Sequence, residues 1–257
     1  MNPAVRTEVV DGVLTITLDR PKANAIDVTT SLALHAAFVR LQQDPALRVA
    51  IITGTGRFFS AGWDLSAAVA GEAIDADHGP GGFAGLTEFF ALDKPVIAAV
   101  NGLAIGGGFE LALAADLIVA AEHAEFFLPE AALGLIADNA TIRLPRVVPP
   151  NIAREMLISG RRMSAAEAQS WGIVNQVTTS ADLMPAARRL AEKICLSAPL
   201  SVAAVLELMR ELETVPKDDA MPILRRNQTY RAAIDSQDAQ EGALAYAEKR
   251  MPKWQGK

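Results

Sequence analysis

Two glutamates downstream of a glycine run are the residues of this sequence best suited to chemistry. Gly106, Gly107 and Gly108 are consecutive, Glu110 follows them, and Glu130 follows after twenty more residues. Glycine lets the backbone approach a bound group closely. If a helix begins here, its free N–H groups stabilise negative charge. An anion-stabilising backbone beside two acids is what proton transfer next to a carbonyl requires.

Both glutamates lie in apolar surroundings. Glu110 belongs to Phe109–Ala115, where helical periodicity leaves it among apolar neighbours, and Glu130 follows Phe126–Pro129. Burial raises the pKa of a carboxyl group above its usual value of about 4.3, which suits it to carry protons near neutral pH. The alternative for each residue is an ordinary solvated or salt-bridged glutamate.

A second glycine element supports the first. Ser60-Ala61-Gly62-Trp63 follows an apolar run at 49–53, just as the glycine run follows an apolar run at 96–100. Two loops at neighbouring strand ends can each donate one backbone N–H to the same oxygen. The alternative is a surface turn, which the aromatic residues around Gly62 disfavour.

Other catalytic motifs are missing from the sequence. It contains no Gly-x-Gly-x-x-Gly, Walker A or Gly-x-Ser-x-Gly motif, and the three histidines (35, 78 and 123) lack zinc-site spacing. Cys195, the single cysteine, excludes an internal disulfide and is predicted to be a small buried core residue. We expect no metal, and we keep His78 as a possible substrate contact.

The elements that must position these residues predict an α/β fold. Short apolar strand patterns alternate with helical patterns up to about residue 180, and Asp11-Gly12 marks a hairpin turn between two alternating strands, 5–9 and 14–18. The other predicted elements are a helix over 29–43, strands over 49–53, 96–100, 117–120, 125–127 and 173–177, and helices over 181–197, 199–213, 218–234 and 236–248.

We therefore expect a core with the site in residues 1–180 and a helical region in 181–257. The helical region is expected to pack on the core or on a neighbouring subunit. Residues 67–85, rich in alanine, glycine and aspartate, are predicted to form a mobile loop over the site.

Composition excludes several classes of protein. The chain has 257 residues, of which 51% are hydrophobic, too many for a disordered chain. A net charge of −6 argues against nucleic acid as a partner. The longest apolar stretch, 109–121, is interrupted by charges and too short to span a bilayer. With no apolar signal region at the N-terminus, the expectation is a cytoplasmic protein without a membrane partner.

Several segments together resemble the crotonase family, the enoyl-CoA hydratases and isomerases. The matching segments are Asp19–Ile26, Phe59–Leu65, Lys94–Gly102, Gly106–Glu110 and Pro129-Glu130. The resemblance implies a crotonase-like spiral of ββα turns with a C-terminal helical trimerisation region, and a homotrimer or hexamer. It also implies an acyl-CoA substrate, whose coenzyme A is part of the substrate, and no separate cofactor.

Further segments resemble one branch of that family, the one that reversibly dehydrates carnitinyl-CoA to crotonobetainyl-CoA. These segments are Thr17–Asp27, Gly79–Glu88, Gly160–Met163, Trp171–Asn175 and Glu241–Arg250. Two alternatives remain open. The first alternative is a general enoyl-CoA hydratase or isomerase acting on another short-chain acyl-CoA. The second is a non-catalytic acyl-CoA-binding protein of the same fold.

The resemblance also implies roles for individual residues. The backbone N–H groups of Trp63 and Gly107 hold the thioester oxygen, Glu130 moves the C2 proton, and Glu110 handles the water or hydroxyl at C3. The residues implied to contact coenzyme A or substrate are Lys22, Ala23, Ala25, Ser60, Ala61, Asp64, Leu65, Gly106 and Lys249.

The trimethylammonium group of this substrate would favour aromatic faces. The candidates are Trp63, Phe83, Phe89 and Phe90, with Glu88 as a counter-charge. The alternative is that these aromatic side chains only pack the loop and an acyl pocket.

One segment departs from the family pattern. Where hydratases usually carry a proline and then a Gly-Gly pair that helps to hold the catalytic water, this chain reads Ala137-Asp-Asn-Ala-Thr141. Side chains are expected where bare backbone is usual. This departure is the reason for the non-catalytic alternative.

Overall fold

A six-stranded sheet forms the centre of the molecule in the computed structural model, which describes residues 3–257. Its strand order is β1-β2-β3-β5-β7-β10. The β1–β2 pair is antiparallel, as expected for a hairpin, and the other pairs are parallel. The bounds are β1 Val5–Val10, β2 Val13–Leu18, β3 Val49–Gly54, β5 Val96–Val100, β7 Leu117–Ala121 and β10 Gln176–Thr178.

A smaller sheet continues from the ends of the central strands. Its order is β4 (Phe58–Ser60), β6 (Leu103–Ile105), β8 (Glu125–Phe127) and β9 (Met163–Ser164). The chain runs from a strand of the large sheet to one of the small sheet and then into a helix, and this succession occurs three times in residues 3–257. The predicted spiral of ββα turns is therefore confirmed.

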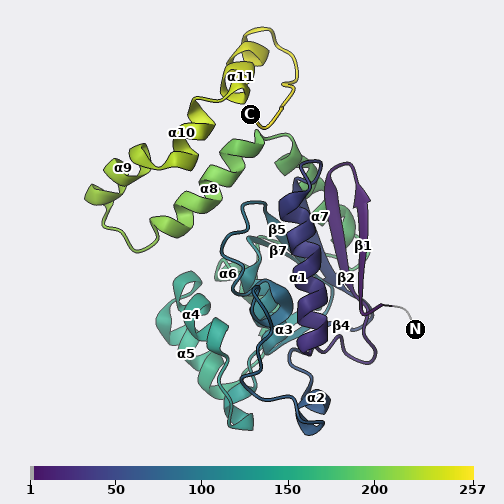
Figure 1. Ribbon diagram of the computed structural model, residues 1–257. Helices are drawn as coiled ribbons and strands as arrows, with labels where there is room; N and C mark the ends of the chain where they lie inside the picture. The colour runs from purple at the N-terminus through teal and green to yellow at the C-terminus, as the bar shows by residue number, and fades with distance from the viewer. Residues whose placement is uncertain (1–2) are drawn as a thin grey trace.

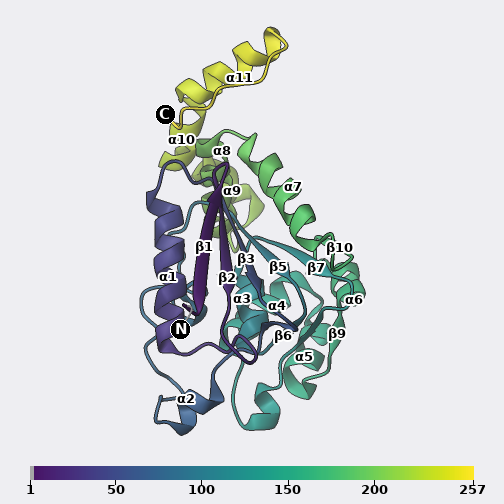
Figure 2. The same ribbon diagram turned by 90° about the vertical axis from the view of Figure 1, so that its right-hand side faces the viewer.

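Both faces of the central sheet are covered, which explains its almost entirely apolar strands. On one face Ile16 and Ile52 pack in the main core with α1 (Val28–Gln43). On the other face Ile51 and its neighbours pack under α7 (Leu183–Cys195). Figure 2 shows the sheet between these two helices. Cys195, predicted to be buried, is half-buried at the end of α7.

The remaining helices of the core are short or connect the strands of the two sheets. They are α2 (Leu65–Val69), the short helix η1 (Phe83–Gly85), α3 (Gly107–Ala114), the short helix η2 (Glu130–Leu133), α4 (Asp138–Val147), α5 (Pro150–Ser159) and α6 (Ala165–Ser170). The helices in 138–170 were not predicted from the sequence. A strand was predicted at 173–177, but residues 173 and 174 close the end of α6 by donating to the carbonyl of Ala168, so β10 starts only at Gln176.

The C-terminal helices form an arm that projects from the core (Figure 1). They are α8 (Pro199–Glu211), α9 (Lys217–Arg226), α10 (Gln228–Ile234) and α11 (Gln237–Ala247). The single helix predicted over 218–234 is two helices, because Asn227 has extended backbone angles and its side chain accepts from the N–H of Tyr230 (2.8 Å). None of the helices in residues 3–257 has the length and apolar character needed to cross a membrane.

Candidate active site

Glu110 is a buried acid held by the start of a neighbouring helix. It lies in the first turn of α3 and is 5% exposed. Its Oε1 accepts a hydrogen bond from the N–H of Ala140 in the first turn of α4 (2.9 Å). Burial raises the pKa of Glu110 to about 7, and the charges of Asp138 and Glu130 add to this effect while the Ala140 N–H opposes it. Glu110 can therefore exchange a proton near neutral pH.

Glu130 lies beside Glu110 because η2 follows the strand next to β6. Its Oε1 is so close to Gly106, at the start of α3, that a Cβ on that glycine would lie 2.3 Å from it. Its Oε2 is buried and has no hydrogen-bond partner within residues 3–257. Burial raises its pKa, and the charge of Asp138 raises it further. The structure thus places both predicted acids at the start of α3.

Two backbone N–H groups near these acids have no acceptor. Ile26 pairs with the loop around Trp63 by donating to the carbonyl of Gly62 (2.8 Å) and accepting from Asp64 (2.9 Å). In such a parallel bridge the N–H of the residue between, Trp63, points the other way. Gly107 opens α3, where a helix offers its N–H no partner. In the part of the chain that the structure describes, neither N–H is bonded.

Gly62 places these two N–H groups together. Its φ is +79°, and a Cβ there would lie 2.7 Å from the nitrogen of Gly107 and 3.2 Å from that of Gly108. The loop that carries Trp63 therefore lies directly on the N-terminus of α3. Phe83 closes the same place from the other side, since its ring would be 2.4 Å from a Cβ on Gly107. The resulting cradle is suited to an oxygen that develops negative charge.

Residues 67–85, predicted to be a loop over the site, contact the side chain of Trp63 and lie against Gly107. Apart from Phe83, this segment contributes Glu72, whose Oε1 accepts from the indole Nε1 of Trp63 (2.8 Å). Its Oε2 accepts from the N–H of Val28 at the start of α1 (3.1 Å). Sequence reasoning missed Glu72, because a single glutamate in a polar loop carries no signal of its own.

Arg20 links the loops 20–27 and 60–65, and its role was also not predicted from the sequence. Its guanidinium binds Asp27, which caps α1, and Asp64, which caps α2, both at 2.7 Å. It also donates to the carbonyl of Ala25 (2.8 Å). The Asp19-Arg-Pro segment was noted only as part of a family pattern, without a role for the arginine.

Several of the residues predicted to contact coenzyme A bind other parts of the protein. The carbonyl of Ala23 accepts from the N–H of Ala61 (2.9 Å). The buried Ser60 hydroxyl donates to the carbonyl of Asn24 (2.7 Å) and accepts from the N–H of Gly62 (3.1 Å). Residues 20–27 and 60–65 therefore form one unit. Whether its surface binds coenzyme A remains a prediction.

Two predicted contact residues, Lys22 and Leu65, are exposed. Lys249 follows α11, which lies at the outer end of the arm, whereas α2 and α3 lie in the lower part of the core (Figure 1). Within one chain the lysine is therefore remote from the site.

The aromatic candidates are spread over the neighbouring surface. Phe83 faces Gly107, and His78 packs edge-on against its ring (5.1 Å). Phe89 instead packs against His35 (4.8 Å), and Phe90 is 64% exposed. Of the four predicted aromatic residues, Trp63 and Phe83 are the ones that the structure places at the two N–H groups.

The unusual segment 137–141 forms the start of α4. The family pattern predicted that side chains here would replace bare backbone beside the catalytic water. The structure shows that a backbone N–H, that of Ala140, still reaches Glu110. The segment therefore keeps one polar contact with the acid pair.

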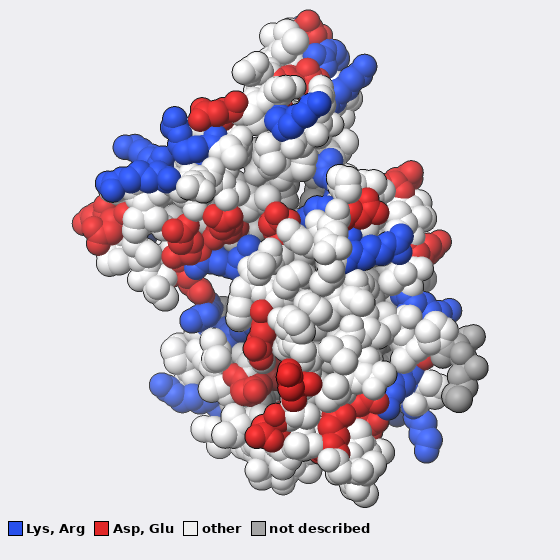
Figure 3. Space-filling model, in the orientation of Figure 1, with Lys and Arg blue, Asp and Glu red and all other residues white. Residues whose placement is uncertain are grey.

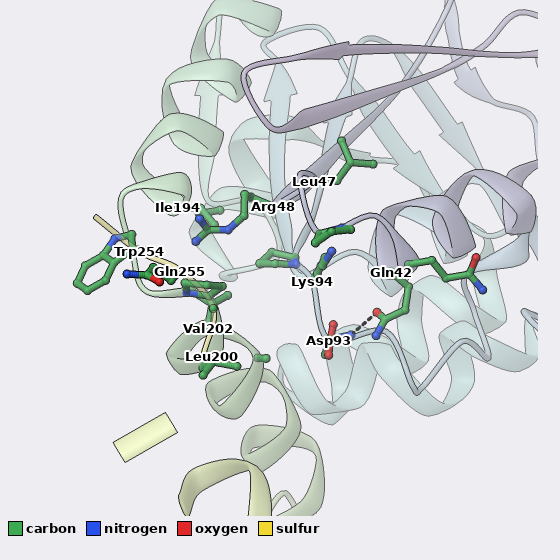
Figure 4. A pocket seen from close by; sticks show the side chains of 16 residues that line it. Gln42, Leu47, Arg48, Asp93, Lys94, Ile194, Leu200, Val202, Trp254 and Gln255 are labelled. Carbon is green, nitrogen blue, oxygen red and sulfur yellow. Dashed lines mark hydrogen bonds between the residues drawn. The ribbon is translucent and has the colours of Figure 1, made fainter. Parts of the chain in front are cut away.

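A separate hollow lies where the arm joins the core. Figure 4 shows its lining, which includes Arg48, Lys94 and Trp254, and its volume is about 350 Å³. Lys94 is engaged there with the carbonyls of Leu41 and Asp44. The hollow contains none of the residues of the acid pair or the N–H cradle, so we do not regard it as the active site.

Comparison with known proteins places these observations in context. A family model described as enoyl-CoA hydratase/isomerase matches residues 8–257. The chain is 58% identical to the carnitinyl-CoA dehydratase of Salmonella typhi over 249 residues, which is 95% of each chain. It has the same identity and coverage with the protein of that name from Salmonella choleraesuis.

Solved structures agree with the fold. An enoyl-CoA hydratase from Mycobacterium tuberculosis superposes with a TM-score of 0.93 at 40% identity, and one from Mycobacterium marinum with 0.93 at 41%. Both matches cover all of this chain and all of the other chain.

Proposed function

The chain belongs to the enoyl-CoA hydratase/isomerase family, and from this premise we propose that it is a hydro-lyase that reversibly dehydrates carnitinyl-CoA to crotonobetainyl-CoA. Identity of 58% over 95% of the chain with dehydratases of that name supports the substrate. The observation that carries the chemistry is the pair of glutamates, one buried and one partly buried, beside two N–H groups that have no acceptor within residues 3–257.

The thioester oxygen binds between the N–H groups of Trp63 and Gly107 in this proposal. Both amides are held by loops on the N-terminus of α3, so they are oriented before the substrate arrives. They stabilise the negative charge that moves onto the oxygen when C2 loses its proton. Each such donor contributes about 10²–10³ in rate.

The two glutamates then divide the proton transfers. Glu130 is ionised and takes the proton from C2, and its unpartnered Oε2 is the oxygen available for it. Glu110 is protonated and gives its proton to the hydroxyl that leaves C3 as water. The raised pKa of about 7 explains how Glu110 keeps that proton near neutral pH. Hydration runs the same steps in reverse.

The reaction removes water without net oxidation, so the proposal includes no redox cofactor. Coenzyme A enters as part of the substrate, and we place its adenine and phosphates along the 20–27 loop with Lys22. We further propose a homotrimer or hexamer located in the cytoplasm. Exposed apolar side chains of the arm, such as Met209, support assembly, and Lys249 would then serve the site of a neighbouring chain.

A general enoyl-CoA hydratase is the second candidate. The solved relatives at 40% and 41% identity carry that name, which favours it. The two candidates differ in whether the acyl group must carry a positive charge.

The direct test follows the absorbance of the enoyl thioester that purified protein forms. Carnitinyl-CoA and 3-hydroxybutyryl-CoA are compared as substrates. We expect turnover of carnitinyl-CoA at a higher kcat/KM. Glu110→Gln and Glu130→Gln should each lower kcat by at least about 10², whereas Glu122→Gln, an exposed control, should retain it.

Preference for 3-hydroxybutyryl-CoA would favour the general hydratase. If both glutamine variants keep the full activity of the wild-type protein, the non-catalytic alternative is supported.

A further inference from the structure

A buried hydroxyl on α1 holds the segment that closes the proposed thioester site. Ser31 lies near the start of α1 and is fully buried. A serine inside a helix commonly bonds a carbonyl of its own helix or points to solvent. The Ser31 hydroxyl instead accepts from the N–H of Ala84 (3.1 Å) and bonds Nδ1 of His78 (2.8 Å), which lie 53 and 47 positions later in the chain. Both bonds fasten residues 78–85 to α1.

The backbone of this 78–85 segment packs directly on α1. A Cβ on Gly85 would lie 2.3 Å from the backbone nitrogen of His35, and one on Gly81 would lie 2.2 Å from the carbonyl oxygen of Gly85. That carbonyl accepts from Nδ1 of His35 (3.1 Å). Figure 3 shows that the surface over the middle of α1 carries mainly uncharged side chains. Close backbone packing and neutral hydrogen bonds therefore hold the segment here.

The bond from Ala84 to Ser31 lies at an unusual point of the backbone. The φ of Ala84 is +54°, in the left-handed region that is unfavourable for a residue with a Cβ, and the residue is fully buried. Such a conformation persists only where the surrounding contacts determine it, and it occurs often at functional sites. The Ser31 hydroxyl is one of those contacts, because it binds the N–H of this residue.

Both partners of Ser31 lead to Phe83. Ala84 is the next residue in the chain, and the ring of His78 packs edge-on against the ring of Phe83 (5.1 Å). Phe83 lies in turn against Gly107, whose N–H is one of the two proposed donors to the thioester oxygen. A ring that keeps water from this place strengthens the hydrogen bond that the N–H makes to the substrate.

We propose that Ser31 is a positioning residue of this enzyme, which holds the ring of Phe83 against Gly107. It acts through Ala84 and His78 and does not touch the reacting atoms. The inference rests on the proposed function, in which Gly107 binds the thioester oxygen. It gives His78, considered from the sequence as a substrate contact, a supporting role instead.

The first test is the kinetics of Ser31→Ala, measured with the substrate that the wild-type protein turns over in the direct test above. The substitution leaves the buried N–H of Ala84 without its acceptor and should let Phe83 move. We expect kcat per folded protein to fall about tenfold or more and KM to change by less than about threefold, because the support matters most when charge builds up on the oxygen.

His78→Phe is the second variant, and it applies even if Ser31→Ala does not fold. It keeps a ring beside Phe83 but cannot bond Ser31, so kcat should fall in the same direction by a smaller factor. In a Phe83→Leu background, Ser31→Ala should have little further effect on kcat, because the ring that it positions is gone.

The second measurement is the infrared C=O stretch of a bound thioester labelled at the carbonyl carbon. The probe is 4-trimethylammoniobutyryl-CoA, or butyryl-CoA if the wild-type protein turns over only 3-hydroxybutyryl-CoA. Neither has a hydroxyl at C3 or a double bond, so neither is dehydrated or hydrated. Hydrogen bonds to the oxygen lower the frequency, and this lowering should be smaller in Ser31→Ala than in the wild-type protein. A role in folding alone would leave the frequency unchanged.

Ser164→Ala is the matched control. Its hydroxyl also accepts a backbone N–H, that of Glu167 (3.2 Å), but it caps α6, away from Phe83. Loss of this cap should lower the melting temperature and leave both kcat and the C=O frequency unchanged. Thermal denaturation of every variant establishes the folded fraction.

The outcomes separate this inference from the function on which it rests. A wild-type protein that turns over substrate and lowers the C=O frequency, with both values kept in Ser31→Ala and His78→Phe, overturns the inference alone. So does an equal loss of kcat on Ser31→Ala with and without the ring of Phe83. A wild-type protein that neither turns over an acyl-CoA nor lowers the frequency rejects the proposed function and the inference with it.

Discussion

Glu110 is a buried acid and Glu130 a partly buried one, and the two carboxyl groups have different partners. Glu110 accepts a hydrogen bond from the start of α4, whereas one oxygen of Glu130 is left without a partner in residues 3–257. The oxygen of Glu130 without a donor is available to accept a proton from carbon, and a carboxyl group with a pKa of about 7 can supply one. These partners support the proposed roles of Glu130 as base and Glu110 as acid.

The pH dependence of activity should report this pair. Both directions need one proton shared between the two acids, since Glu130 is ionised and Glu110 protonated before dehydration and the reverse holds before hydration. Deprotonation of Glu110 removes that proton, so kcat/KM should fall as the pH rises above about 7. A second proton on the pair, added at lower pH, should also stop the reaction.

Initial rates over about pH 5 to 9, taken in both directions, check this prediction. The two directions should show the same bell-shaped profile. A rate that stays constant through pH 7 and above would contradict the role of Glu110.

At the scale of elements, the site depends on the contact between the loop at 60–65 and the N-terminus of α3. Gly62 is the point of contact, because any side chain there meets the nitrogen of Gly107. Glu72 and Arg20 hold the same loop from its other sides, through Trp63 and Asp64. The proposed cradle for the thioester oxygen thus depends on several packed loops.

Gly62→Ala should separate the two loops and lower kcat by about 10²–10³, the value of one lost N–H donor. Gly172 supplies a matched control, since its φ of +83° is nearly the same but a Cβ there meets no atom within 4 Å. Gly172→Ala should cost about 1–2 kcal/mol of stability from backbone strain and retain kcat. Steady-state kinetics with thermal unfolding distinguishes the two effects, and equal kcat values in both variants would contradict the role of Gly62.

At the scale of the whole molecule, the arm is the part least explained by a single chain. α7 packs on the sheet, but α8, α9 and α10 share only a small core in residues 3–257, of Ala204, Leu208 and Ala233 with partly buried neighbours. Val205 and Met209 lie one turn apart on α8 and are 54% and 70% exposed. An apolar surface of this kind is typical of a subunit interface.

The double variant Val205→Asp/Met209→Asp should form a smaller assembly than the wild-type protein. Each apolar side chain buried in an interface contributes about 1.5–3 kcal/mol, and a charge in its place opposes association. Gln169→Asp on α6, an exposed polar position of the core, is the control. Sedimentation velocity checks the result, and a wild-type protein that sediments as a monomer would contradict the predicted trimer or hexamer.

Local patterns in the sequence determined the elements and the candidate acids. The β-branched runs at 49–53 and 96–100 predicted buried strands, and apolar neighbours predicted the burial of Glu110, because strand and helix periods act over a few residues. The helices at 138–170 were not predicted, since their breaks and caps depend on packing against α3 and the small sheet.

Only the tertiary structure decided how these parts meet. The contact of Gly62 with Gly107 and the hydrogen bond from Ala140 to Glu110 join residues that are distant in sequence. Such contacts leave no periodic signal in the chain, because each depends on the path of the backbone between them. Sequence therefore identified which groups could react, and the fold determined where each one points.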